Sequence, residues 1–175
     1  MSDKIRSIAI LMSLIGVIFV SGCASTGTIL LHDSVTVKLS NFKNMMLDVT
    51  SQVSDSGQGV VQLESEIISR LRTKGLFERV FSRAAGDDAP HDLTVLVTIK
   101  EIRKVSPGAR VTLGAFAGQG KMIVNIQLLD ASSGSVVAQA TAEGKTSGGT
   151  VFAGTTPQAV SKIADEVVKL IEQNM

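Results

Sequence analysis

Two amphipathic segments place the strongest constraint on the fold of this chain. Residues 59–74 and 156–173 each carry apolar side chains at three- and four-residue spacing, the pattern of a helix with one buried face. Each apolar stripe needs a surface to cover it, and the alternating, β-branched segments between the two stripes predict a sheet. Both stripes find cover only if the two helices lie on the same face of that sheet.

The other elements follow from apolar alternation and turn residues. Strands are expected at residues 34–39, 76–81, 92–104, 121–130 and 135–143. Residues 24–33 are expected to be a short tether and residues 40–58 a loop with a short helical turn. No strand–helix–strand crossover repeats, which argues against a doubly wound parallel sheet. The prediction is an α+β domain: a single mixed, mostly antiparallel sheet of about five strands, with two helices on one face.

The N-terminus has the three parts of a secretory signal. Lys4 and Arg6 make a short basic start, residues 8–20 are apolar apart from one serine, and small residues follow. The apolar run is shorter than the roughly 20 residues that span a bilayer. We therefore expect residues 1–22 to be a cleaved signal peptide, with an uncleaved signal anchor as the alternative.

The stretch Val20-Ser21-Gly22-Cys23 resembles the lipobox of bacterial lipoproteins. That resemblance implies cleavage between Gly22 and Cys23, a diacylglycerol on the sulfur of Cys23 and an acyl chain on its new amino group. It implies no other cofactor. Two or more acyl chains make a stable membrane anchor. Ala24, in a place where Asp tends to retain such proteins at the inner membrane, implies the periplasmic face of the outer membrane.

Composition excludes several classes of function for the mature chain, residues 23–175. Cys23 is the only cysteine, so neither an internal disulfide nor a cysteine-rich metal site is possible. Without Asp3, Lys4 and Arg6, the acidic and basic residues balance, and Trp and Tyr are absent. A neutral domain without stacking platforms is not expected to bind nucleic acid. We expect residues 34–175 to form one periplasmic domain after a lipidated tether at 23–33.

Candidate chemical motifs are weak. Gly144-Lys145-Thr146 suggests a phosphate loop, but Gln139 stands where that motif requires glycine, so no nucleotide binding is expected. The two histidines are His32 and His91, and neither has a recognisable nucleophile or orienting partner.

A metal site is also weakly supported. His91 with Asp87, Asp88 and Asp92 offers metal-binding atoms without fixed spacing, and we interpret this segment as a solvated turn. We therefore expect no catalytic residues, no metal and no enzyme activity.

Two glycine-rich segments share a short likeness, Phe116-Ala117-Gly118 and Phe152-Ala153-Gly154. Phe116 and Phe152 are candidates for an apolar patch that binds a partner or a second copy of the chain. The alternative, which we favour, is that both rings fold back over the sheet.

The C-terminal half resembles the DUF4410 family of bacterial envelope proteins. The resemblance rests on residues 114–121, on a strand ending at Asp130 with Gly134 four residues on, on Ser147-Gly148-Gly149, and on the final amphipathic helix. It would cover about residues 34–173. The family has no assigned function. The order of elements is also similar, at the level of fold, to small periplasmic lipoprotein domains that activate peptidoglycan synthases or build secretion rings.

The leading hypothesis is thus a non-enzymatic lipoprotein that binds an envelope partner or assembles with itself. Two alternatives stay open: a peptidoglycan hydrolase with an unrecognised site, and a carrier of an apolar small molecule between sheet and helices.

Overall fold

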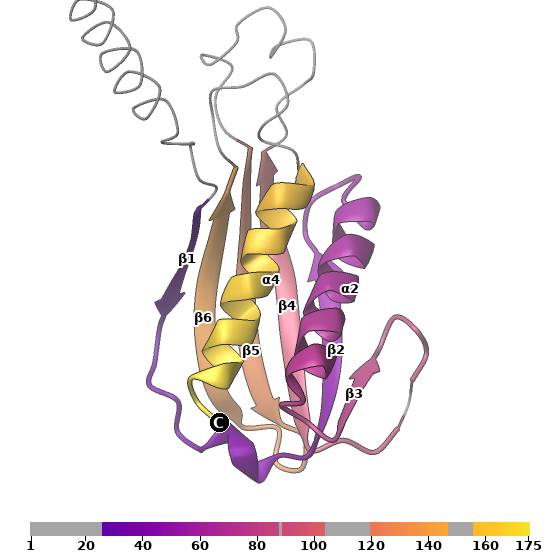
Figure 1. Cartoon of the computed structure of the whole chain (residues 1–175), viewed down its shortest axis with the longest axis vertical. Coiled ribbons are helices and arrows are strands. Elements are labelled where there is room, and N and C mark those ends of the chain that lie inside the picture. The colour runs from indigo at the N-terminus through magenta and orange to yellow at the C-terminus, as the bar shows by residue number, and fades with distance from the viewer. Residues whose placement is uncertain (1–25, 88, 104–119, 147–155) are drawn as a thin grey trace, which may run out of the picture.

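The computed structural model describes residues 26–87, 89–103, 120–146 and 156–175. Six strands form one sheet in the order β1-β6-β5-β4-β2-β3, and helices α2 and α4 lie side by side on one of its faces (Figure 1). The elements are β1 (Thr26–Leu31), a 3-10 turn η1 (Leu39–Asn41), β2 (Asn44–Ser51), α2 (Gly57–Lys74), β3 (Arg79–Ser82), β4 (Leu93–Arg103), β5 (Lys121–Asp130), β6 (Val136–Lys145) and α4 (Thr156–Glu172). The predicted fold class is confirmed, with six strands where about five were expected.

The sheet is mixed. Strands β1, β6, β5 and β4 pair antiparallel, whereas β2 pairs parallel with both of its neighbours, β3 and β4. Parallel neighbours need a crossover, and α2 provides it between β2 and β3. This crossover places α2 over one face of the sheet.

The core fills the space between the sheet and the two helices. Alternate residues of β4 and β5 turn toward the helices and are fully buried. The apolar stripes of the helices meet them, as the spacing predicted. The buried side chains that make this contact are Leu93, Val95, Val97, Ile99, Met122, Val124, Ile126, Leu128, Leu63, Ile67, Leu71, Val160, Ile163 and Val167.

Three predictions for the N-terminal part were wrong. Residues 26–31 are not part of an unpacked tether but form the edge strand β1, paired with β6 along its whole length. Residues 34–39 form no strand: Thr36 donates one backbone hydrogen bond to Val137, and η1 begins at Leu39. Residues 44–51, placed in a loop, are strand β2.

The burial of β2 explains why it was missed. Met45, Met46 and Leu47 are consecutive and all fully buried, although neighbouring residues of a strand point to opposite faces of the sheet. Met46 therefore interrupts the apolar–polar alternation of β2, and alternation was the signal used.

The remaining helices and strands begin or end a few residues away from the predicted positions. Helix α2 begins at Gly57 and ends before Gly75, whose φ of 61° lies in the left-handed region that glycine adopts readily. Strand β3 is shorter than expected, and β6 continues to Lys145. Among the described residues, no helix combines the length and apolar composition needed to cross a membrane.

Candidate functional site

Four strands have their ends together at one edge of the sheet, the upper edge in Figure 1. The register aligns Thr26 with Lys145, Lys145 with Lys121, and Lys121 with Arg103. These four residues, one from each of β1, β6, β5 and β4, are called the Thr26 edge below. The edge therefore brings together residues that are up to 119 positions apart in the chain.

A buried threonine closes the sheet just beyond this row. The hydroxyl of Thr146 accepts a hydrogen bond from the backbone N–H of Gly120 at 2.8 Å, and the N–H of Thr146 donates to the carbonyl of Gly120 at 3.0 Å. Thr146 is 1% exposed. Because β5 and β6 are joined on both sides of Lys121 and Lys145, the positions of these two lysines are fixed by the sheet.

The Thr26 edge is positively charged. Lys145 pairs with Glu143 at 2.7 Å and Lys121 pairs with Glu101 at 3.5 Å, while Arg103 is exposed. The two glutamates face the same side as the cations and lie one row further into the sheet. Like charges directly opposite each other on neighbouring strands are destabilising. Repulsion between three cations in register therefore lowers the stability of the sheet at this edge.

The predicted lipidation site lies outside the described residues, as do Gly22, Phe116 and Phe152. Their connection to the Thr26 edge is nevertheless fixed by the chain. Cys23 precedes Thr26 by three residues, which span at most about 11 Å. The segment that contains Phe116 joins Arg103 to Gly120, and the segment that contains Phe152 joins Thr146 to Thr156. Arg103, Gly120 and Thr146 lie at or next to strand ends at this edge, whereas Thr156 begins α4.

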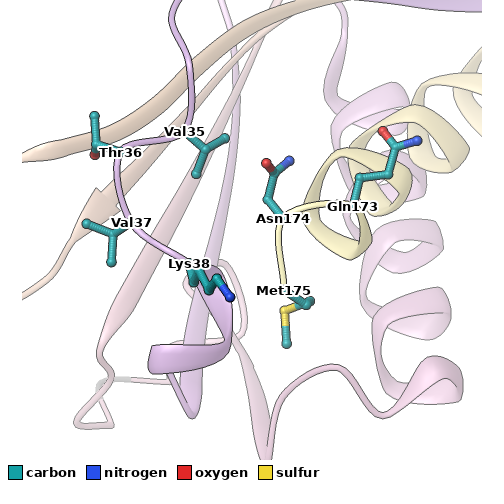
Figure 2. Close-up of a pocket in the computed structure, with 7 residues that line it drawn as sticks. All are labelled: Val35, Thr36, Val37, Lys38, Gln173, Asn174 and Met175. Atoms are coloured by element: carbon teal, nitrogen blue, oxygen red, sulfur yellow. The ribbon is translucent and has the colours of Figure 1, made fainter.

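An open groove lies at the opposite edge of the sheet, next to the C-terminus. It has a volume of about 290 Å³ and is lined by residues 35–38 and 173–175 (Figure 2). The N–H of Leu39 donates to the carbonyl of Asn174 at 2.8 Å, which ties the C-terminus to η1. The groove offers backbone groups, two amides and the amine of Lys38. These groups can hold a polar ligand, but they include no pair of nucleophile and base.

One buried carboxylate was not singled out by the sequence. Glu64 on α2 accepts a hydrogen bond of 2.5 Å from the hydroxyl of Ser82 on β3, and both residues are buried. The Ser82 hydroxyl in turn accepts from the N–H of Ala85 at 3.0 Å. This contact ties the helix to the edge strand. The signal in the sequence was the position of Glu64, which falls on the apolar stripe of the helix beside Leu63 and Ile67.

The acidic turn around His91 does not converge on one point. Asp92 accepts hydrogen bonds from the N–H groups of Asn44 and Lys43, both at 3.0 Å, and these bonds lower the pKa of its carboxyl. Asp87 accepts from the N–H of Ser82 at 3.1 Å.

The imidazole of His91 bonds to the hydroxyl of Thr94 and to the carbonyl of Ala89. Each described group of this turn therefore serves a local contact. Asp88 lies outside the described residues.

Two further candidates have structural roles. The imidazole of His32 bonds to the hydroxyl of Thr141 at 2.8 Å. Gly144 lies in β6 and faces α4, where a Cβ atom would lie 2.5 Å from the carbonyl oxygen of Ala159. The string Gly144-Lys145-Thr146 is therefore the end of a strand, and its glycine permits close packing of a helix.

Residues 31–150 match the sequence profile described as a domain of unknown function, DUF4410. The chain belongs to the DUF4410 family. No curated protein matches this DUF4410 protein.

The chain is similar to several solved structures. The PelC dodecamer from Paraburkholderia phytofirmans is 20% identical, with a TM-score of 0.55, over 83% of this chain and 97% of that one. Protein XCC0632 from Xanthomonas campestris is 13% identical, with a TM-score of 0.50, over 75% and 86% of the two chains. Lipoprotein GNA1162 from Neisseria meningitidis is 12% identical, with a TM-score of 0.46, over 75% and 99%.

Proposed function

We propose that this DUF4410 protein is a non-enzymatic lipoprotein, anchored through Cys23 at the periplasmic face of the outer membrane, that assembles with copies of itself or with an envelope partner. The observation that carries the proposal is the position of β1. This strand begins three residues after Cys23 and is paired with β6 over all six of its residues.

The pairing of β1 supports a fixed position for the domain at the membrane. A long tether would let the domain turn freely, whereas a three-residue connection of at most about 11 Å does not. The Thr26 edge then faces the bilayer, and the C-terminal groove of Figure 2 faces away from it. In this orientation the segments containing Phe116 and Phe152 are attached on the membrane side.

Self-assembly is supported by the likeness to PelC. That protein forms a dodecamer, and the structural match covers 97% of its chain and 83% of this one. The shared fold supports the proposal that copies of this chain assemble as well.

The two alternatives gain no support from the described residues. A hydrolase needs an accessible nucleophile or acid, whereas Glu64 and Ser82 are buried and bonded to each other. A carrier needs a cavity between sheet and helices, whereas fully buried side chains fill that space.

The anchor is tested by the mass and location of the protein. Wild type should have the mass of residues 23–175 plus acyl chains and should fractionate with the outer membrane. Cys23→Ala should keep residues 1–22 and lack acyl chains. Ala24→Asp, with the cysteine intact, should keep the acyl chains but move to the inner membrane. A wild type that carries residues 1–22 or lacks acyl chains contradicts the proposal.

Assembly is tested by native mass spectrometry of the lipidated chain extracted in mild detergent. We expect one defined oligomer, or a stoichiometric complex with another envelope protein. A monomer at every concentration, with no partner recovered from solubilised envelopes, would refute this part and leave the anchor untouched.

A further inference from the structure

The three cations of the Thr26 edge share one face of the sheet. Arg103, Lys121 and Lys145 are direct register partners on three neighbouring strands. Residues opposite each other in a sheet point to the same side. Their neighbours Ile99, Val124 and Ala142 face the helices and are buried, so the cations lie on the face that the helices leave open. With strands about 4.8 Å apart, the backbone positions of the three cations span about 10 Å.

A β-bulge produces this alignment. The register of β4 against β5 shifts between Ile99 and Glu101. Without the shift, Arg103 would share the side of Ile99 and point toward the helices, because side chains alternate. With the shift, Glu101 and Arg103 turn to the open face. The bulge thus places a cation beside two others, although repulsion between them has a cost.

The two carboxylates near the row do not balance it. Glu101 and Glu143 pair with Lys121 and Lys145, and both lie one row further from the edge. The outermost row of paired strand residues contains the cations and Thr26. On these strands the cations lie nearer to the edge than the two carboxylates, so a negative ligand at this edge is attracted to the row.

The fourth member of the row, Thr26, lies close in sequence to the proposed anchor. Thr26 is the register partner of Lys145, and Cys23 is at most about 11 Å further along the chain. That distance is close to the Debye length of 8–10 Å at physiological ionic strength. Salt therefore does not fully screen the cations of the row from the headgroup charges of a bilayer that holds the Cys23 lipid.

We infer that Arg103, Lys121 and Lys145 bind the phosphate groups of anionic phospholipids in the leaflet that holds the Cys23 lipid. The inference rests on the proposed anchor. Ammonium and guanidinium groups both bind phosphate, and basic residues beside a lipid anchor strengthen attachment to anionic membranes. The mature chain has equal numbers of acidic and basic residues, so the residues outside the row carry a net negative charge and the attraction to an anionic membrane is local to this edge. The row orients the domain on the membrane as well as strengthening its attachment.

Lysine labelling of the lipidated chain tests the inference. The chain is reconstituted into neutral phosphatidylcholine vesicles and into vesicles with one-third phosphatidylglycerol, and each amine is labelled with an acylating reagent. We expect the rates at Lys121 and Lys145 to fall about fivefold with the anionic lipid, and to recover in high salt. Lys43, at the opposite end of the sheet and paired with Glu78, should react equally in both vesicles.

Substitution supplies a second readout. The triple variant R103Q/K121Q/K145Q should lose the rise in melting temperature that phosphatidylglycerol gives the wild type. The matched variant K38Q/K43Q/R79Q removes three cations from the other end and should keep that rise. If the triple variant also fails to fold in neutral vesicles, the labelling of the wild type decides.

The outcomes separate the inference from the anchor. A chain that lacks acyl chains and does not float with neutral vesicles contradicts the anchor. A chain that floats, with equal labelling of Lys121 and Lys145 in both vesicles, overturns the inference alone. Protection in native envelopes but not in phosphatidylglycerol vesicles also overturns it, because the occupant is then a protein or another polymer.

Discussion

At Gly144 the backbone of β6 lies directly against α4. A Cβ atom here would lie 2.5 Å from the carbonyl oxygen of Ala159 and 3.0 Å from a side-chain carbon of Ile163. Since the first contact is with backbone, α4 has to move away from the sheet. We predict that Gly144→Ala lowers the free energy of unfolding by about 1–3 kcal/mol, measured by urea denaturation. Gly57→Ala is the control, because no atom lies within 4 Å of its Cβ and it should be neutral or slightly stabilising. Equal stability of the two variants would contradict this account of Gly144.

Asp92 joins the start of β4 to the start of β2. Bonds from the N–H groups of Asn44 and Lys43 lower the pKa of its carboxyl below the ordinary value of about 3.9. A lowered pKa in the folded state stabilises the protein above the unfolded pKa, and that contribution is lost as the pH falls through the folded pKa. We predict that wild type exceeds Asp92→Asn in stability at pH 7 and that the difference shrinks below about pH 4. Urea denaturation at several pH values measures it, with Asp33→Asn as the charge-matched control. A difference that persists unchanged at pH 2 would refute the prediction.

Among the elements, β1 is the one that would link the proposed anchor to the domain. The N–H of His32 donates to the carbonyl of Gln139, and donors in an antiparallel pair recur at every second residue, so the N–H of Leu30 also faces β6. Leu30→Pro removes this donor and leaves a carbonyl of β6 without its partner. We predict a loss of about 1–3 kcal/mol in the free energy of unfolding and faster proteolysis between residues 24 and 33. Ser34→Pro, beyond the strand, should change neither. If both variants behave as wild type, residues 26–31 are a tether after all.

The elements that the sequence predicted correctly are those covered on one face. The stripes of α2 and α4 and the alternation of β4 and β5 follow from one apolar side and one polar side. Strand β2 was missed because Met46 interrupts its apolar–polar alternation, and β1 was missed because its partner β6 is distant in the chain. The cationic row was not predictable for a related reason. Arg103 joins Lys121 and Lys145 only through the bulge after Ile99, and pairing register is not visible in a single sequence.

At the scale of the whole molecule, the proposed anchor would place the two ends of the sheet at different distances from the membrane. Strand β6 spans ten residues, or about 33 Å, between the Thr26 edge and the hairpin turn that contains Ser133. If only Ala24 and Ser25 join a lipid-anchored Cys23 to β1, the turn stands away from the bilayer and the start of β1 lies near it. Cys23 is the only cysteine, so if its sulfur carries the proposed lipid, a cysteine introduced elsewhere takes a fluorophore selectively. We predict strong quenching by a headgroup-labelled quencher lipid for a fluorophore at Thr28→Cys, and little for one at Ser133→Cys. Equal quenching at both positions would mean that the sheet lies flat on the bilayer, and the groove beside Asn174 would then not face the periplasm.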